Sequence, residues 1–134
     1  MWRLIERFRR KSAIRHAGGP DPWTVIEDYD GDLKIRVDRS AFMGSSIYWL
    51  GYHAFNELQL LNRLLKPPMV FADVGANQGE FTLFAAKRLR EGRVLAFEPV
   101  ESLYRQLMEN VRMNGFRNVT AYDFGLSDRS EVRD

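Results

Sequence analysis

Cysteine is absent from this chain of 134 residues. Disulfide frameworks, zinc sites built on thiolates and catalytic thiols are therefore excluded. The absence is compatible with a reducing cytoplasm, and we expect a cytoplasmic protein. Long apolar runs are also missing, because no stretch approaches the ~20 residues that a membrane-spanning helix needs. What is present suffices for one globular core, since 45% of the residues are hydrophobic and 28% are charged.

The small net charge of +2 conceals a strongly basic start. Residues 1–16 hold six basic side chains against a single acidic one, Glu6, so the rest of the chain is acidic on balance. Trp2, Ile5 and Phe8 recur in this segment at helical spacing. Two interpretations stand: a basic amphipathic helix in weak contact with an anionic membrane surface, or an ordinary N-terminal helix that packs on the domain. Because no basic face continues beyond it, we expect no nucleic-acid partner.

Breaker residues divide the chain into segments 1–22, 23–68 and 69–134. The cluster from Gly18 to Pro22 ends the basic segment. In the second segment, residues 24–29 and 33–37 flank an Asp-Gly turn, which predicts a β-hairpin. An irregular stretch is expected around Gly44. A helix follows over residues 54–65 and ends before Pro67.

The third segment alternates strand and helix. Strands are predicted at residues 69–72, 93–97 and 118–122, and helices at 79–90 and 101–114. The first two strands are continuous apolar runs, which is typical of strands buried on both faces. The alternation predicts an α/β fold with right-handed crossovers and a doubly wound parallel sheet. In the expected strand order the first strand lies at an open edge of that sheet.

The loop that follows the first strand carries the chemistry, because ligands of open α/β sheets bind beyond the carboxyl ends of the strands. Gly75 allows a sharp turn and close approach to a ligand, and Gly79 lets the next helix start close to the strand. The spacing of these glycines differs from the G-x-G-x-x-G pattern that cradles a pyrophosphate. Asp73 would also repel a phosphate. A cationic cofactor without phosphates, S-adenosylmethionine (SAM), fits this loop.

Glu98 closes the second strand, and Pro99 holds that corner extended. An acidic side chain about 20 residues beyond a glycine loop can accept hydrogen bonds from both ribose hydroxyls. Many nucleotide cofactors use an acidic residue in this way, so Glu98 alone does not indicate which cofactor binds. Together with Asp73 and the glycine spacing it favours SAM.

These motifs resemble the FkbM-type family of SAM-dependent methyltransferases. Residues 71–79 and 94–99 carry the resemblance, supported by residues 107–114 and 125–128. The resemblance implies a class I methyltransferase fold and O-methylation of a hydroxyl on a sugar, polyketide or other small acceptor. It also implies cofactor contacts around the methionine, ribose and adenine of SAM. The resemblance and the residues together predict ten cofactor-binding residues: Asp73, Gly75, Ala76, Asn77, Gly79, Glu98, Pro99, Leu126, Ser127 and Asp128.

Simpler interpretations stand beside these roles. Asp73 is a candidate helix cap, Glu98 a candidate solvated charge, Asn77 a candidate left-handed turn residue and Asp128 a candidate turn residue. No residue is assignable as a catalytic base or a metal ligand, and Glu57 is expected on the surface. We expect the chain to be the N-terminal, SAM-binding part of an enzyme, inactive alone. A non-catalytic nucleotide-binding or interaction module is the alternative, and an NAD-dependent oxidoreductase ranks last.

Overall fold

The computed structural model describes residues 21–129. The chain divides into two compact units, with the boundary between Gln59 and Leu60, and each unit is described by itself. The predicted basic helix of residues 1–16 lies outside the described residues. The predicted segment boundary at residues 68 and 69 stays a prediction.

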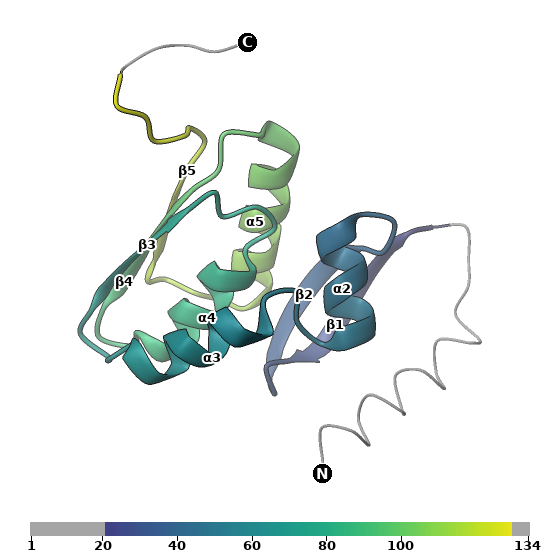
Figure 1. Cartoon of the computed structure of the whole chain (residues 1–134), viewed down its shortest axis with the longest axis horizontal. Coiled ribbons are helices and arrows are strands. Elements are labelled where there is room, and N and C mark those ends of the chain that lie inside the picture. Colours follow the sequence, from purple (N-terminus) through teal and green to yellow (C-terminus); the bar gives the residue numbers. More distant parts are fainter. Residues whose placement is uncertain (1–20, 130–134) are drawn as a thin grey trace. The chain divides into compact units, whose positions relative to one another are not determined.

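The first unit contains an antiparallel hairpin and a helix (Figure 1). Strands β1 (Trp23–Tyr29) and β2 (Leu33–Asp38) pair with Trp23 opposite Asp38. Asp30 and Gly31 between them have φ angles of 47° and 100°. Asp-Gly sequences favour such positive angles, which match the twist of a hairpin. The predicted hairpin is confirmed.

Helix α2 (Phe42–Leu50) replaces the irregular stretch expected around Gly44, and that expectation was wrong. Glycine and serine favour loops over helices, but here a close contact decides the conformation. A Cβ atom on Gly44 would lie 2.0 Å from the carbonyl oxygen of Asp38 at the end of β2. Only glycine lets the helix come this close to the strand.

Helix α3 (Phe55–Leu64) spans the boundary between the units, and the second unit is a three-stranded parallel sheet with two further helices. Its elements are β3 (Val70–Val74), α4 (Glu80–Arg88), β4 (Arg93–Phe97), α5 (Glu101–Met113) and β5 (Val119–Tyr122). The strand order is β3-β4-β5, so β3 lies at an edge as predicted. All five predicted elements of this unit are present, with ends that differ by a few residues.

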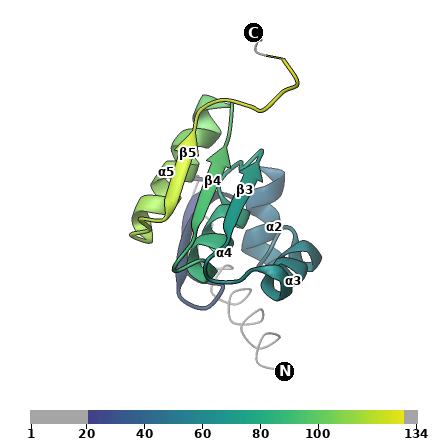
Figure 2. The same cartoon turned by 90° about the vertical axis from the view of Figure 1, so that its left-hand side faces the viewer.

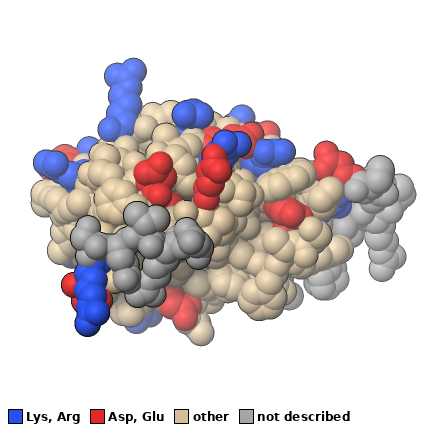
Figure 3. All heavy atoms as spheres, turned by 90° about the horizontal axis from the view of Figure 1, so that it is seen from above, with Lys and Arg blue, Asp and Glu red and all other residues tan. Residues whose placement is uncertain are grey.

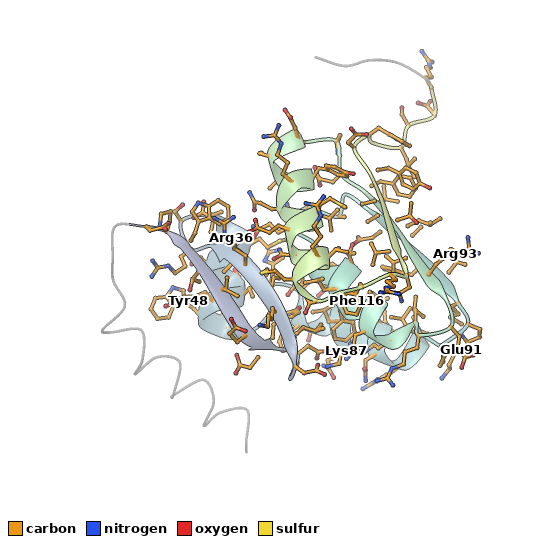
Figure 4. All side chains as sticks on the ribbon, turned by 180° about the vertical axis from the view of Figure 1, so that it is seen from behind. Arg36, Tyr48, Lys87, Glu91, Arg93 and Phe116 are labelled. Carbon is orange, nitrogen blue, oxygen red and sulfur yellow. The ribbon has the colours of Figure 1, made fainter. Side chains whose placement is uncertain are left out.

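Helices α4 and α5 cover one face of this sheet (Figures 1 and 2). The core beneath them is a cluster of Ala85, Ala86, Leu89 and Val94, against which Phe116 packs (Figure 4). The side-chain amide of Asn118 donates hydrogen bonds to the carbonyl oxygens of Ala86 and Leu89, at 3.0 and 2.8 Å. These bonds satisfy carbonyl groups at the end of α4 and tie that helix to the start of β5.

Within the described part of the second unit, residues 60–129, the other face of the sheet carries no helix (Figure 2). Val70 and Val74 are each 58% exposed on β3, while Val94 and Ala96 of β4 are fully buried under the helices. The interpretation of β3 as a strand buried on both faces was therefore wrong, and Leu95 and Phe97 on the same face of β4 are only half-buried. An apolar run shows that a strand is hydrophobic, but it does not show how many layers cover it.

Strand β3 also extends further than expected. Asp73 and Val74 pair with Ala96 and Phe97 of β4, so Asp73 belongs to the strand and not to the loop after it. No helix in the described part of the chain is long and apolar enough to cross a membrane.

Candidate functional site at the carboxyl ends of the strands

The loop between β3 and α4 has the conformation that its glycines predict. Gly75, Asn77 and Gly79 have φ angles of 79°, 51° and 95°. Asparagine tolerates this left-handed region better than most residues, so the turn interpretation of Asn77 is confirmed. A Cβ on Gly75 would meet no atom within 4 Å. The loop is therefore open at Gly75, where a ligand can approach the backbone closely.

The end of β4 holds this loop through main-chain atoms. The backbone N–H groups of Gly75 and Ala76 both donate to the carbonyl oxygen of Phe97, at 2.9 and 3.0 Å. The N–H of Gly79 then donates to the carbonyl of Ala76 at 2.9 Å. Because these bonds need no particular side chain, the loop geometry depends on the backbone of two neighbouring strands.

Glu98 is buried at the same edge, with only 4% of its surface exposed. Its Oε2 accepts a hydrogen bond from the N–H of Asn77 at 2.7 Å, and its Oε1 accepts one from the N–H of Val100 at 2.9 Å. The interpretation of Glu98 as a solvated strand-end charge was therefore wrong. The side chain instead joins the loop after β3 to the loop after β4, and each oxygen keeps a second lone pair for another donor.

Asp73 is the second buried carboxylate at this edge, 7% exposed. The hydroxyl of Thr82 donates to its Oδ2 at 2.5 Å, and the backbone N–H of Thr82 also donates to the carboxylate. Burial raises the pKa of Asp73 above its usual value, and the negative charge of Glu98 raises it further, while the bonds from Thr82 lower it. Thr82 is the third residue of α4, and Gly79 has no side chain to cap that helix. Gly79 is therefore the N-cap of α4, and the interpretation of Asp73 as the N-cap residue was wrong; its carboxylate reaches the helix from β3 through Thr82.

Gly79 allows a close contact, but with a different element from the one expected. A Cβ at this position would lie 2.7 Å from Cδ1 of Leu107 on α5, where the sequence had suggested close packing on the strand. Helix α5 also supports the loop through Asn110, whose side-chain amide donates to the carbonyl oxygen of Gln78 at 2.8 Å. The start of α4 is therefore fixed against α5.

The segment after β5 passes beside the corner at Pro99. A Cβ on Gly125 would lie 3.6 Å from Cγ of Pro99, which places this segment next to the residue after Glu98. The three predicted adenine-loop residues are exposed, and the hydroxyl of Ser127 donates to Oδ1 of Asp128 at 3.2 Å. This local bond agrees with Asp128 as a turn residue. The structure thus places Gly125 beside Pro99, and the adenine-contact role of residues 126–128 stays a prediction.

An aromatic cluster lies beside these loops. The rings of Phe97 and Tyr122 stack with centroids 4.9 Å apart, and Phe124 contacts both.

The sequence did not predict two residues that hold the site in place, Thr82 and Asn110. Asn110 gives a signal in retrospect, because it is a polar side chain on the apolar stripe of its helix. Thr82 gives none, since nothing in the sequence shows which helical turn faces the strand.

Two buried carboxylates, a glycine loop and open backbone thus meet at one edge of the sheet. Such an arrangement can bind a ligand that offers cationic or hydroxyl groups. Figure 3 shows acidic and basic side chains interspersed on the face that is seen from above. Within residues 21–129, no three His, Asp or Glu side chains gather as candidate metal ligands.

No family model matches the chain. Among curated proteins, it is 42% identical over 65 residues to the AMB antimetabolite synthetase AmbE of Pseudomonas aeruginosa. The matched segment is 48% of this chain and 3% of that synthetase, so the likeness concerns a small part of a far larger protein.

Solved structures share the fold. TYW2 of P. horikoshii, in complex with MeSAdo, is 24% identical with a TM-score of 0.62, and the match covers 80% of this chain and 38% of that one. TYW2 of M. jannaschii, in complex with AdoMet, has the same identity and TM-score over 77% and 43%. Trm5b of Pyrococcus abyssi is 19% identical with a TM-score of 0.60, over 80% and 30%. The predicted class I methyltransferase fold is confirmed, and the chain spans less than half the length of these structures.

Proposed function

We propose that this chain binds SAM as the donor-binding part of a SAM-dependent methyltransferase. The observation that carries the proposal is the pair of buried carboxylates, Asp73 and Glu98, on either side of an open glycine loop. The fold supports it, because two of the similar structures, the TYW2 proteins, were solved in complex with MeSAdo and AdoMet.

The donor groups of the site fit this cofactor. Glu98 keeps a free lone pair on each oxygen, which suits the two hydroxyls of a ribose. Asp73 offers negative charge to the ammonium and sulfonium groups of the methionine part. The backbone at Gly75 is open to close approach. A nucleotide with phosphates fits less well, because Asp73 and Glu98 are both acidic and no basic side chain within residues 21–129 bonds to either.

The bound cofactor would supply an electrophilic methyl group for in-line transfer to an acceptor, with the sulfur keeping the bonding electron pair. The chain itself orients the donor, and orientation supplies a large part of the acceleration in such transfers. A general base would take the proton of an acceptor hydroxyl. None of the described residues is assigned that part.

The acceptor we propose is a hydroxyl on a sugar, polyketide or other small molecule, methylated on oxygen as the FkbM-type resemblance implies. The two acidic side chains of the site, Asp73 and Glu98, support a small acceptor over a nucleic acid, whose phosphates favour a basic surface. A cytoplasmic location and weak membrane contact of residues 1–16 remain predictions of the sequence.

Calorimetric titration with S-adenosylhomocysteine tests the donor site. A folded protein that contains this sequence in full is expected to bind it with one site per chain, and to bind NAD more weakly. Glu98→Gln should weaken the affinity, while the exposed Glu101→Gln should leave it unchanged. Absence of binding by the folded protein would contradict the proposal. Binding without methyl transfer to any small hydroxyl acceptor would favour the alternative of a non-catalytic nucleotide-binding module.

A further inference from the structure

Thr82 is fully buried on the first turn of α4 and faces Asp73 across the strand-to-helix crossover. It donates two hydrogen bonds to the same carboxylate, one from its hydroxyl at 2.5 Å and one from its backbone N–H. The backbone bond is available to any residue at this position. The hydroxyl bond is available only to threonine or serine. A substitution of Thr82 by another residue therefore removes the hydroxyl bond and leaves the backbone bond in place.

We propose that Thr82 is a positioning residue of the donor site, whose hydroxyl holds Asp73 in the orientation that receives a cationic donor. The inference rests on the proposed function, because it assigns a role to Asp73 toward SAM. It goes beyond that function because Thr82 itself touches no ligand. Its effect reaches the ligand through one carboxylate oxygen, Oδ2.

The physical argument concerns a carboxylate in a poorly solvated place. A buried carboxylate that lacks hydrogen-bond donors rotates to find them or takes up a proton. Burial raises the pKa of Asp73, and the negative charge of Glu98 raises it further. Among the described residues, Glu98 is the charged group that acts on Asp73. The bonds from Thr82 oppose this by stabilising the ionised form. A neutral Asp73 would lose its attraction for a cation, so the hydroxyl maintains both orientation and charge.

The test compares Thr82→Val with Thr82→Ser. Valine keeps the shape of threonine without its hydroxyl, and serine keeps the hydroxyl without the methyl group. We expect Thr82→Val to weaken SAM binding about tenfold, the effect of one lost hydrogen bond to a charged group. Thr82→Ser should restore the affinity. As the pH is lowered, SAM affinity should decline at a higher pH in Thr82→Val than in the unmodified protein, because Asp73 then takes up a proton more readily.

A double-mutant cycle with Asp73→Asn separates positioning from general destabilisation. If Thr82 acts through Asp73, then Thr82→Val should change SAM affinity little once Asp73→Asn is present. Equal tenfold losses in both backgrounds would overturn the inference, as would an unchanged pH profile in Thr82→Val. If the valine variant does not fold, Thr82→Ala provides the same comparison against Thr82→Ser. Failure of the unmodified folded protein to bind SAM would overturn the proposed function, and this inference with it.

Discussion

The backbone N–H of Asn77 donates a hydrogen bond of 2.7 Å to Oε2 of Glu98, which lies 21 residues further along the chain. The same carboxylate receives the N–H of Val100 through its other oxygen. One side chain therefore fixes the relative position of the two loops of the candidate site. Preorganisation of this kind lowers the ordering cost that binding would otherwise carry.

Glu98→Gln should lower the stability of the unit as well as its ligand affinity. A glutamine offers one acceptor oxygen and turns an NH2 group toward the second backbone N–H, which leaves that donor without a partner. We expect a loss of about 1–3 kcal/mol in the free energy of unfolding, measured by urea denaturation. Hydrogen exchange at the amides of Asn77 and Val100 should become faster. Glu101→Gln is the matched control, because the Glu101–Arg105 pair is exposed and should change stability by less than about 1 kcal/mol.

Gly79→Ala should be more damaging than Gly115→Ala. Both glycines have positive φ angles, 95° and 64°, so alanine is strained at either position. A Cβ at Gly79 would also lie 2.7 Å from Leu107, whereas at Gly115 it would meet nothing within 4 Å. We expect losses of about 2–4 kcal/mol and about 1 kcal/mol respectively, compared by thermal and chemical unfolding. Similar losses would show that the contact with Leu107 relaxes without cost.

Gln78→Leu should make the protein more stable. The side chain is 2% exposed, and its Oε1 is buried without a hydrogen-bond partner. Replacing an unsatisfied buried oxygen with apolar atoms of similar volume should contribute about 1 kcal/mol to the free energy of unfolding. Gln78→Glu should have the opposite effect, because it places a charge at the same buried position. Stability that falls in both variants would argue against an unsatisfied oxygen at this site.

The stability contributed by Asp73 should depend on pH in a direction opposite to that of most carboxylates. Its pKa is raised in the folded protein because of burial, so the folded state binds the proton more tightly than the unfolded chain. The ionised carboxylate therefore costs stability above the raised pKa, and that cost disappears as the pH falls below the usual value of an aspartate. Urea unfolding across the acid range should show the unmodified protein gaining stability relative to Asp73→Asn as the pH is lowered.

Val70→Lys should reduce self-association. Val70 is 58% exposed on β3, an edge strand whose free hydrogen-bonding groups can pair with another chain. A lysine discourages such pairing. Sedimentation velocity at increasing protein concentration should show a smaller associated fraction in this variant. Ser102→Lys on helix α5 is the control, because it adds the same charge at an exposed polar position that is not on an edge strand.

Local signals in the sequence predicted most of the fold. The Asp30-Gly31 turn and the alternation of strand and helix depend on neighbouring residues, so they could be read directly. Helix α2 could not, because a contact with Asp38 decides the conformation around Gly44. The exposed face of β3 could not either, since an apolar strand has the same sequence whether one face or two are covered.

The sequence predicted which residues form the candidate site, but not the hydrogen bonds between them. Glu98 and Asn77 were both singled out as ligand contacts, yet nothing in the sequence showed that they bond to each other. Asp73 was predicted to face a ligand or to be the N-cap of a helix, but Gly79 is that N-cap, and the hydrogen bond from the Thr82 hydroxyl to Asp73 was not foreseen. Such links join residues from separate elements, and they follow only once the strand register is known.

The carbonyl oxygen of Phe97 receives two backbone N–H groups from the glycine loop, and every amino acid except proline carries such a donor. Substitutions can accumulate at Val74, Ala76 or Phe97 without disturbing those bonds. Proteins with this crossover can therefore diverge far in sequence while the loop keeps its form. Searches for further relatives should accordingly weigh backbone geometry at this turn above residue identity.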